Sequence, residues 1–500
     1  MKIVGGTRHV SRLAVWALTV TMVTTVSWSC GGGGHHKKKA PVPSILNING
    51  SSDPASPVDV AIEINGSGFG ARPGRVDFTD TLDPSNVAVV VPVSSGWSNT
   101  GVVAVVPSAG SVGPFPIPGT VTVTVVTGGG TSNGVDLDLV DTPTFSPSNL
   151  TWTQTTPLPM PMRGLAASPV RVDDANAYVV LAGGNDGLSN LSAVYTNTLA
   201  PDGTLGPAWT TEPNSLPAPR AYHALVEANP QNAGLLDPDD RFVYVIGGQA
   251  DAADTPGGTD TVYMARVSVL DGSVGSWSQT AALPRRLVGP AAVLYNGFVY
   301  IVSGLQTDGT PSEAVYKARV QSDGALEPWV RASNDYPTPV SFARVFGFGA
   351  SLYVVSGDPD TSLDPHEQGR LGGTKDVYLA SAQNGTIGSW TATARAIKQR
   401  KKHIVWAAFG QIVAAEGIYN GGIGGSEAER SAVLPDGSLS PWNGLTGAAI
   451  IAANVYNAAA FVSPIRVPLG APRFLLLGGQ VFTATPPGGL SSAVYFNDGP

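Results

Sequence analysis

Apolar and polar residues alternate over short stretches of the chain after residue 57, which is the period of a β-strand. Val58, Val60, Ile62 and Ile64 occupy every second position and would share one face of such a strand. Further stretches rich in β-branched residues follow at 75–78, 87–91, 102–106 and 121–126, with glycines and prolines between them. The pattern predicts an antiparallel β-sandwich over residues 41–141.

Three motifs within this predicted sandwich carry a family resemblance. They are Gly66-Ser67-Gly68-Phe69-Gly70, the Arg75-Val76-Asp77-Phe78 that follows it, and a closing Ser132-Asn133-Gly134. Together they resemble an IPT/TIG domain, an Ig-like (E-set) sandwich that usually acts as a rigid spacer or an interaction module. The alternative for the glycines is a phosphate-binding loop, but that loop requires a helix directly after it, and none is predicted here.

Residues 150–500 contain an internal repeat. Tryptophans recur with a mean spacing of 58 residues, at positions 152, 209, 277, 329, 390 and 442. In each period an apolar strand ends in a Gly pair or a variant of it, and a short strand, usually with Val-Tyr, follows. Asp-Gly or Asn-Gly precedes most of the Trp residues, and this is a strong hairpin signal because both residues tolerate positive φ. The pairs are Gly183-Gly184, Gly247-Gly248, Ser303-Gly304, Ser356-Gly357, Glu416-Gly417 and Gly478-Gly479.

These landmarks resemble the kelch motif of galactose-oxidase-type propellers. The best single match runs from Leu216 to His223 and is followed by Gly247-Gly248. The resemblance implies an all-β protein in which the Ig-like sandwich is followed by a six-bladed kelch β-propeller over residues 150–500, with five or seven blades as alternatives. We expect the Trp side chains to pack between blades, and the segment near Trp152 to complete the last blade and close the ring.

The N-terminus predicts export. Lys2, Arg8 and Arg12 precede an uncharged run at 13–26 that is too short for a comfortable membrane span but suits a signal peptide over residues 1–29. Cys30 directly after it resembles the lipidated cysteine of a bacterial lipoprotein, followed by a flexible Gly/His/Lys stalk over 30–40. We therefore expect a lipid anchor at Cys30 in the outer membrane or at the cell surface, with simple secretion as the alternative.

Composition narrows the classes of function. Charged residues make up 13% of the chain and the net charge is −8, so no cationic surface for nucleic acid is expected. Because Cys30 is the only cysteine, neither a disulfide nor the Tyr–Cys crosslink of galactose oxidase can form in the predicted propeller.

The kelch resemblance also implies where a ligand would bind, on the face formed by the loops after the Gly pairs and the segments leading into the first strands. Arginine, carboxylate and amide groups there suit a polar ligand such as a sugar or an acidic peptide. The alternative is that they are ordinary turn residues and salt bridges. The candidates are Arg163, Asn185, Asp186, Arg220, Gln249, Arg285, Arg286, Gln306, Asp358, Arg400 and Gln480, with Asp251, Asp308, Asp360, Lys401 and Asn420 beside them.

The leading hypothesis is a lipid-anchored surface protein that binds a glycan or a protein without catalysis. A sugar-acting enzyme of the sialate mutarotase type and a structural envelope component are the alternatives. We expect no cofactor and no His-based metal site, since His223, His366 and His403 lie in different repeats. Calcium is a weaker possibility at 237–240 or 358–367, and the basic run 395–403 could meet an anionic partner.

Overall fold

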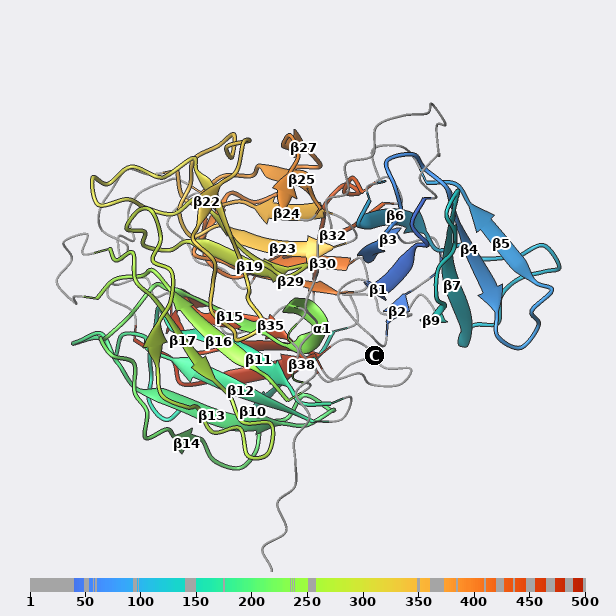
Figure 1. Cartoon of the computed structure of the whole chain (residues 1–500). Helices are drawn as coiled ribbons and strands as arrows, with labels where there is room; N and C mark the ends of the chain where they lie inside the picture. Colours follow the sequence, from blue (N-terminus) through green and yellow to red (C-terminus); the bar gives the residue numbers. More distant parts are fainter. Residues whose placement is uncertain are drawn as a thin grey trace, which may run out of the picture. The chain divides into compact units, whose positions relative to one another are not determined.

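The structure is a computed structural model in which almost every regular element is a β-strand (Figure 1). In the part of the chain that it describes, the one helix is α1 (Pro230–Ala233), a single turn. The described residues are 40–48, 54–56, 58, 61–92, 97, 99–139, 150–173, 176–233, 235, 237, 239–250, 258–348, 351–359, 373–383, 385–408, 411–419, 427–434, 437–446, 455–464, 473–481 and 489–497.

Residues 41–139 form two sheets that share one hydrophobic core. Ile62 and Ile64 of one sheet and Phe78 and Val123 of the other are fully buried in it, as the alternating pattern requires. The predicted strand at 58–64 begins three residues later and extends to Ser67. The first sheet contains β1 (Ser44–Ile48), β3 (Ala61–Ser67) and β6 (Gly101–Val105); the second contains β2 (Ala55–Ser56), β9 (Val135–Leu139), β7 (Gly119–Thr127), β4 (Arg75–Asp80) and β5 (Val87–Val90), with β8 (Gly130–Thr131) paired to β7.

The glycine-rich motif at 66–70 is a structural turn. A Cβ on Gly66 would overlap the Ser44 carbonyl oxygen, and Gly68 and Gly70 both have positive φ. The turn buries Phe69 beside Trp97, whose indole N–H donates to the Gly70 carbonyl at 3.1 Å. Because these residues build the core, the motif has a packing role rather than a phosphate-binding one.

The described part of residues 150–497 forms six small antiparallel sheets, which we number 1 to 6 along the chain, and two short strand pairs. Sheets 1 to 3 contain β11 (Ala166–Arg171), β12 (Ala177–Ala182), β13 (Val194–Leu199) and β14 (Thr210–Thr211); β15 (Ala224–Ala228), β16 (Phe242–Ile246), β17 (Val262–Arg266) and β18 (Ser278–Gln279); and β19 (Ala291–Tyr295), β20 (Phe298–Val302), β21 (Val315–Arg319) and β22 (Val330–Arg331).

Sheets 4 to 6 repeat this order with local changes. Sheet 4 contains β23 (Arg344–Phe348), β24 (Ser351–Val355), β25 (Val377–Gln383), β26 (Thr386–Ile387) and β27 (Thr391–Ala392), and sheet 5 contains β29 (Ile404–Ala408), β30 (Gln411–Ala415), β32 (Ala428–Ala432) and β33 (Asn443–Gly444). Sheet 6 contains β35 (Ala459–Val462), β36 (Phe474–Leu477), β38 (Val494–Asn497) and β10 (Trp152–Thr155), and two short pairs join β28 (Arg400–Lys401) to β31 (Ile418–Tyr419) and β34 (Val455–Tyr456) to β37 (Gln480–Val481).

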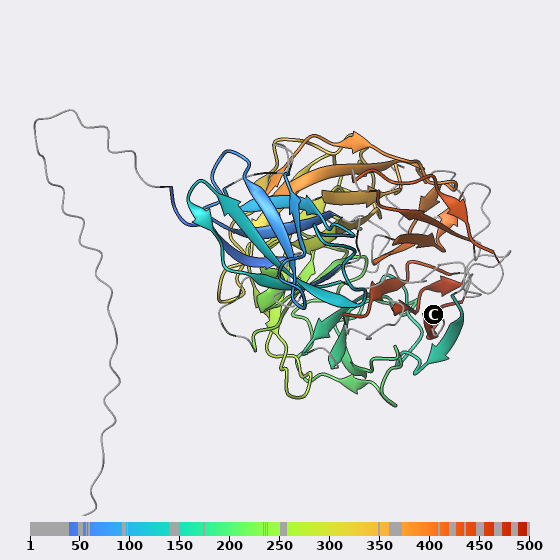
Figure 2. The same cartoon turned by 90° about the vertical axis from the view of Figure 1, so that its right-hand side faces the viewer.

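Sheet 6 joins the two ends of this region. β10 pairs antiparallel with β38, so that Trp152 lies opposite Asn497, and the red C-terminal strand lies beside the teal residues near 150 (Figure 2). This pairing confirms the prediction that the segment near Trp152 completes the last sheet. The pairing covers the edge of β38, which would otherwise present unpaired N–H and C=O groups.

The six sheets make a closed ring. Their first strands contact one another in cyclic order, from β11 through β15, β19, β23, β29 and β35 back to β11. At each junction the N–H of the second Gly-pair residue donates to a carbonyl of the next sheet, over 2.7–3.3 Å. The six bonds run from Gly184 to Arg220, Gly248 to Leu287, Gly304 to Val340, Gly357 to Arg400, Gly417 to Val455 and Gly479 to Met162.

The first residue of each Gly pair has a left-handed backbone even where it is not glycine. Ser303, Ser356 and Glu416 have φ of 62°, 50° and 58°. Such conformations are uncommon for residues with a side chain. At Ser303 and Glu416 the side chain accepts a hydrogen bond from the next sheet: Val340 N donates to Ser303 Oγ at 2.9 Å, and Val455 N to Glu416 Oε2 at 2.7 Å. A cross-sheet hydrogen bond thus offsets the strain at Ser303 and Glu416.

The repeated tryptophans occupy equivalent places. The indole N–H groups of Trp277, Trp329, Trp390 and Trp442 each donate to a carbonyl just after the outer strand of the preceding sheet, at 2.8–3.3 Å. Each indole therefore joins two neighbouring sheets, as predicted.

Candidate functional site

Six equivalent residues line the centre of the ring at the Gly-pair face, and we call them the inner-ring residues. All six have φ between 53° and 58°, and in five of them the backbone N–H donates to the carbonyl of the preceding inner-ring residue around the ring, at 2.8–3.1 Å. Each lies two residues before the start of a first strand. They are Gly164, Tyr222, Gly289, Phe342, Lys402 and Asn457.

Side chains of the inner-ring residues fill the centre of this face. The Tyr222 ring covers Gly164 and the Phe342 ring covers Gly289, where an added Cβ would lie 2.7 Å from each ring. Tyr222 meets Phe342 edge to face at 6.0 Å, and the Lys402 ammonium lies 5.3 Å from the centre of the Phe342 ring. The expected polar pit is thus occupied here by aromatic rings and a stacked lysine.

Residues directly before the inner-ring residues reach back to the preceding sheet. Arg163 Nη1 of sheet 1 donates to Gln480 Oε1 of sheet 6 at 2.7 Å. In the same position of sheet 5, Lys401 Nζ lies 3.2 Å from Asp358 Oδ2 of sheet 4. These contacts bring together four of the polar residues that the sequence placed on this face, and they join adjacent sheets.

Residues two places before the inner-ring residue point into their own sheet. The buried Arg220 guanidinium lies over the Tyr263 ring at 5.2 Å and donates to Thr261 Oγ1. The buried Arg400 donates through Nε to Glu429 Oε1 at 3.0 Å. Tyr263 and Glu429 occupy the same position of the third strands. Arg220 and Arg400 therefore act inside their sheets, where no ligand on the face would meet them.

Asn185, Asp186 and Gln249 shape the loops after the Gly pairs. Asn185 donates to Asn190 Oδ1 at 2.9 Å, and Asn190 donates to the Gln249 carbonyl at 3.0 Å. The Asp186 carboxylate accepts the N–H groups of Ser189 and Leu188, and these hydrogen bonds hold its pKa below its usual value. These three residues therefore stabilise the turns of the loops after the Gly pairs.

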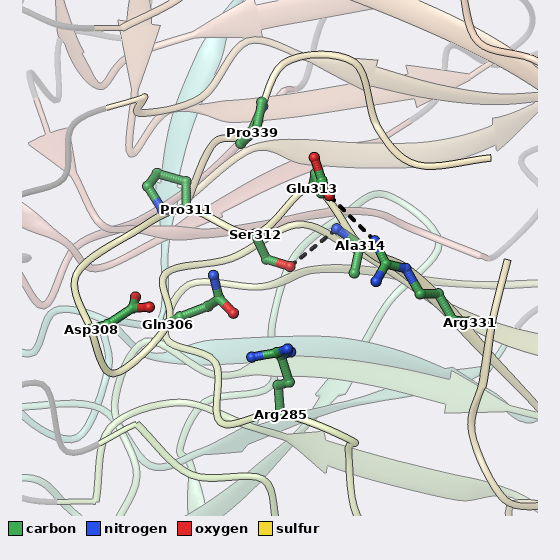
Figure 3. Close-up of a pocket in the computed structure, with 9 residues that line it drawn as sticks. All are labelled: Arg285, Gln306, Asp308, Pro311, Ser312, Glu313, Ala314, Arg331 and Pro339. Carbon is green, nitrogen blue, oxygen red and sulfur yellow. Dashed lines mark hydrogen bonds and ion pairs between the residues drawn. The ribbon is translucent and has the colours of Figure 1, made fainter. Parts of the chain in front are cut away.

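A polar cleft of about 280 Å³ lies at the edge of sheet 3 and contains the remaining candidates except Arg286 (Figure 3). Its charged lining residues are Arg285, Asp308, Glu313 and Arg331, and Gln306 and Ser312 add neutral polar groups. Arg285 and Gln306 belong to the predicted set, whereas Arg286 is exposed and does not line the cleft.

Three of the charged side chains in the cleft have defined partners. Arg331 Nη2 lies 2.6 Å from Asp335 Oδ2 and 3.4 Å from Glu313 Oε1. Asp308 accepts hydrogen bonds from the Thr310 hydroxyl and N–H, and these bonds lower its pKa, with the Arg285 charge contributing. Asp308 is therefore an ionised acceptor near neutral pH.

Arg285 differs from these neighbours. It is exposed, and no hydrogen bond or ion pair ties it to any described residue. Its five N–H donors are available to a ligand, in the planar arrangement that matches a carboxylate. The combination of one unpaired guanidinium with carboxylate, amide and hydroxyl groups can recognise a molecule that carries both hydroxyls and an anionic group.

Sequence reasoning missed Ser312, Glu313 and Arg331. Glu313 stands just before the Val-Tyr strand of sheet 3, and Arg331 lies two residues after Trp329. The repeat gave their strand positions. It gave no sign that the third and fourth strands would face the segment containing Arg285, because that depends on how the sheet is assembled.

The basic run 395–403 is paired with acids along most of its length. Arg395 lies 2.8 Å from Asp376 Oδ1, and Lys398 lies 2.6 Å from Glu427 Oε2. Arg400, Lys401 and Lys402 are buried. The run therefore offers little free positive charge to an anionic partner.

The described residues do not form a metal-binding site. No three His, Cys, Asp or Glu side chains come together there, and Asp240 pairs with Arg266 at 2.9 Å. Asp251, Asp360, Asn420, His366 and the N-terminal segment with Cys30 lie outside the described residues. No helix among the described residues is long and apolar enough to span a membrane.

Comparison with known proteins finds structural likenesses, among them a distant one to YjhT. A solved structure of YjhT is similar to this chain, with 13% sequence identity and a TM-score of 0.46, over 68% of this chain and 95% of YjhT. No family model matches the chain, and no curated protein matches it either. We therefore interpret the site from its own residues.

Proposed function

We propose that residues 150–500 form a six-bladed kelch-type β-propeller whose polar cleft at sheet 3 binds an acidic glycan without catalysis. The closed set of cross-sheet hydrogen bonds and the equivalent tryptophans support the propeller. The observation that carries the binding function is Arg285, an exposed guanidinium without an ion pair to the described residues, inside a polar cleft of about 280 Å³.

The chemistry of the cleft favours a sugar acid over a purely neutral sugar. A guanidinium binds a carboxylate through two parallel hydrogen bonds, and such charge-assisted bonds are the strongest polar contacts available. Gln306, Ser312 and Asp308 supply donors and acceptors suited to hydroxyl groups. Asp308 is held ionised, so it accepts hydrogen bonds from ligand hydroxyl groups rather than donating a proton.

The proposal includes the rest of the chain. Residues 41–141 are an Ig-like domain of the IPT/TIG type that acts as a spacer, supported by the shared core of its two sheets. Residues 1–29 are a signal peptide, Cys30 carries a lipid anchor, and residues 30–40 are a stalk that presents the propeller at the bacterial surface. Labelled palmitate incorporation that disappears in Cys30→Ala would support the anchor, and incorporation that survives the substitution would refute it.

A matched pair of variants tests the cleft. Arg285 and Arg286 are adjacent and exposed, but only Arg285 lines the cleft. A glycan array identifies acidic ligands of the purified protein, and calorimetry then measures their affinity. We expect Arg285→Ala to weaken binding about tenfold or more, the value of one charge-assisted hydrogen bond, and Arg286→Ala to leave it unchanged.

Two results would overturn the proposal. Equal losses in both variants would mean that general positive charge, rather than the cleft, attracts the glycan. Acceleration of sialic acid anomer interconversion by the wild-type protein, followed by NMR, would assign the protein to the sugar-acting alternative instead.

A further inference from the structure

A second site lies inside the ring, where the first strands of the sheets enclose a cavity of about 170 Å³. Most of its lining is small and apolar, with Ala166, Ala224, Ala291 and Ala459 from four different sheets. A larger cavity of about 410 Å³ adjoins it and shares several lining residues, among them Ala167 and Ala292. An interior of this size holds several water molecules or one small ligand.

Arg344 breaks the apolar pattern of the cavity. It is the first residue of β23 and pairs with Val355, the residue just before the Gly pair of sheet 4. The same register position holds alanine in four of the other sheets and isoleucine in the fifth. Those residues are Ala166, Ala224, Ala291, Ile404 and Ala459.

The guanidinium of Arg344 extends from sheet 4 towards sheets 5 and 6. Nε donates to the His403 carbonyl of sheet 5 at 2.6 Å, and Nη2 approaches the Ala458 carbonyl of sheet 6 at 3.4 Å. A guanidinium has five N–H donors, so three remain after these two bonds. The small alanine side chains beside it leave space for an acceptor.

Among the described residues, no carboxylate forms an ion pair with Arg344; Glu227, which lines the larger adjoining cavity, accepts hydrogen bonds from Asn229. No Asp or Glu occurs among the described residues that line the cavity of about 170 Å³, and desolvation lowers the pKa of Arg344 to about 10. His223 lines the same cavity, and burial, followed by the Arg220 charge, lowers its pKa to about 3, so it is neutral at physiological pH. Arg344 is partly exposed, and the backbone carbonyls beside it carry only partial negative charges, so a fully charged anion in the cavity would complement it.

We propose that the cavity of about 170 Å³ inside the ring binds a small oxyanion, either a carboxylate or an inorganic anion, through the free N–H groups of Arg344. Such an anion supplies the missing negative charge and accepts two parallel hydrogen bonds from the planar guanidinium. This site is separate from the cleft at sheet 3 and does not depend on the glycan proposal. The competing interpretation is that Arg344 only joins sheets 4, 5 and 6 through its two carbonyl contacts.

Thermal unfolding of the purified protein in inorganic phosphate, and separately in acetate, tests the site, with potassium chloride at equal ionic strength as the reference. A ligand that binds the folded state raises Tm in proportion to its saturation. We expect a concentration-dependent rise in Tm for the wild type and for Arg285→Ala, and no rise for Arg344→Met, which keeps an unbranched apolar chain but removes the charged guanidinium. The probe that produces the rise identifies the source of the oxyanion.

Crystallography keeps the proposal falsifiable if Arg344→Met does not fold. Crystals of the wild-type protein soaked in selenate should show an anomalous selenium peak beside the Arg344 guanidinium. The proposal is overturned if neither probe raises the wild-type Tm and the peak is absent. It is also overturned if Arg344→Met retains the full rise in Tm, or if Arg285→Ala abolishes it.

Discussion

Sheets 3 and 5 both carry two adjacent basic residues in the segment leading into the first strand, yet the pairs have opposite environments. Arg285 and Arg286 are exposed, whereas Arg400 and Lys401 are buried and paired with acids. The difference is their distance from the inner-ring residue. Arg400 lies two residues before Lys402, and Arg285 lies four residues before Gly289. Position relative to the inner ring therefore decides whether an arginine stabilises the ring or faces solvent.

The same rule explains the other basic residues of this face. Arg220 stands two places before Tyr222 and is buried like Arg400, and Arg163 stands one place before Gly164 and reaches the preceding sheet like Lys401. The rule also separates residues suited to ligand binding from those with structural partners. Three measurements test the contrast between sheets 5 and 3.

Breaking the Arg400–Glu429 pair should have the largest effect. Glu429 also accepts the N–H groups of Ile397 and Lys398, so it holds the whole segment before β28. Glu429→Gln leaves a buried guanidinium without its counter-charge, and we expect a loss of about 3–5 kcal/mol in the free energy of unfolding by urea titration. Glu427→Gln removes the exposed partner of Lys398 and should cost less than about 1 kcal/mol. Equal losses of unfolding free energy in Glu429→Gln and Glu427→Gln would contradict the contrast between buried and exposed ion pairs.

Acidification should destabilise the protein through His403. This histidine follows the inner-ring residue Lys402 of sheet 5, and the equivalent position of sheet 3 holds Pro290, which does not titrate. Burial, with the charges of Arg344 and Arg400, holds the pKa of His403 well below its usual value. The unfolded chain then binds a proton that the folded chain excludes, so this stability is present above pH 6.5 and is lost as pH falls. Between pH 7 and 5 we expect His403 to account for a loss of about 2 kcal/mol.

Urea titrations at several pH values measure this loss, and His403→Gln should reduce it. His223 is buried as well, and its contribution should persist in that variant. A pH dependence that is identical in wild type and His403→Gln would contradict the prediction.

The smallest effect is expected at Arg285. Because it has no ion pair or hydrogen bond to the described residues, Arg285→Ala should change the free energy of unfolding by no more than about 0.5 kcal/mol, as typical surface substitutions do. Urea titration of this variant beside Glu429→Gln measures both ends of the comparison. A loss above about 2 kcal/mol would give Arg285 a structural role and remove it from the cleft argument.

Much of the fold could be predicted because its signals repeat. Spacing of Trp residues and Gly pairs indicated six similar sheets, and the unpartnered Trp152 segment indicated the closing strand, which the pairing of β10 with β38 confirms. The glycines of the Asp-Gly and Asn-Gly pairs were expected in hairpin turns only because glycine tolerates a positive φ. The structure adds that Gly324 packs on the Phe242 ring and Gly385 on the Phe298 ring, contacts between neighbouring sheets that turn chemistry does not reveal.

The candidate site was predicted only in part. Arg285 and Gln306, which the sequence named as candidates, line the cleft. It also selected Arg220 and Arg400, whose guanidinium groups pack within their sheets, and it passed over Arg344. Residue type and loop position could not separate these arginines, because a shift of two residues changes which neighbours a side chain meets.

The sequence by itself determined the β-strands, their turns, the number of repeats and the way the ring closes, since each depends on local periodicity and on residues that recur in every unit. Only the tertiary structure decided which cations are neutralised and which are left without a carboxylate. The partners of Arg400 and Lys401 come from another strand and from a neighbouring sheet, and Arg344 has no carboxylate beside it among the described residues because of the strands that the ring brings together. Charge compensation acts through space, and sequence spacing does not encode it.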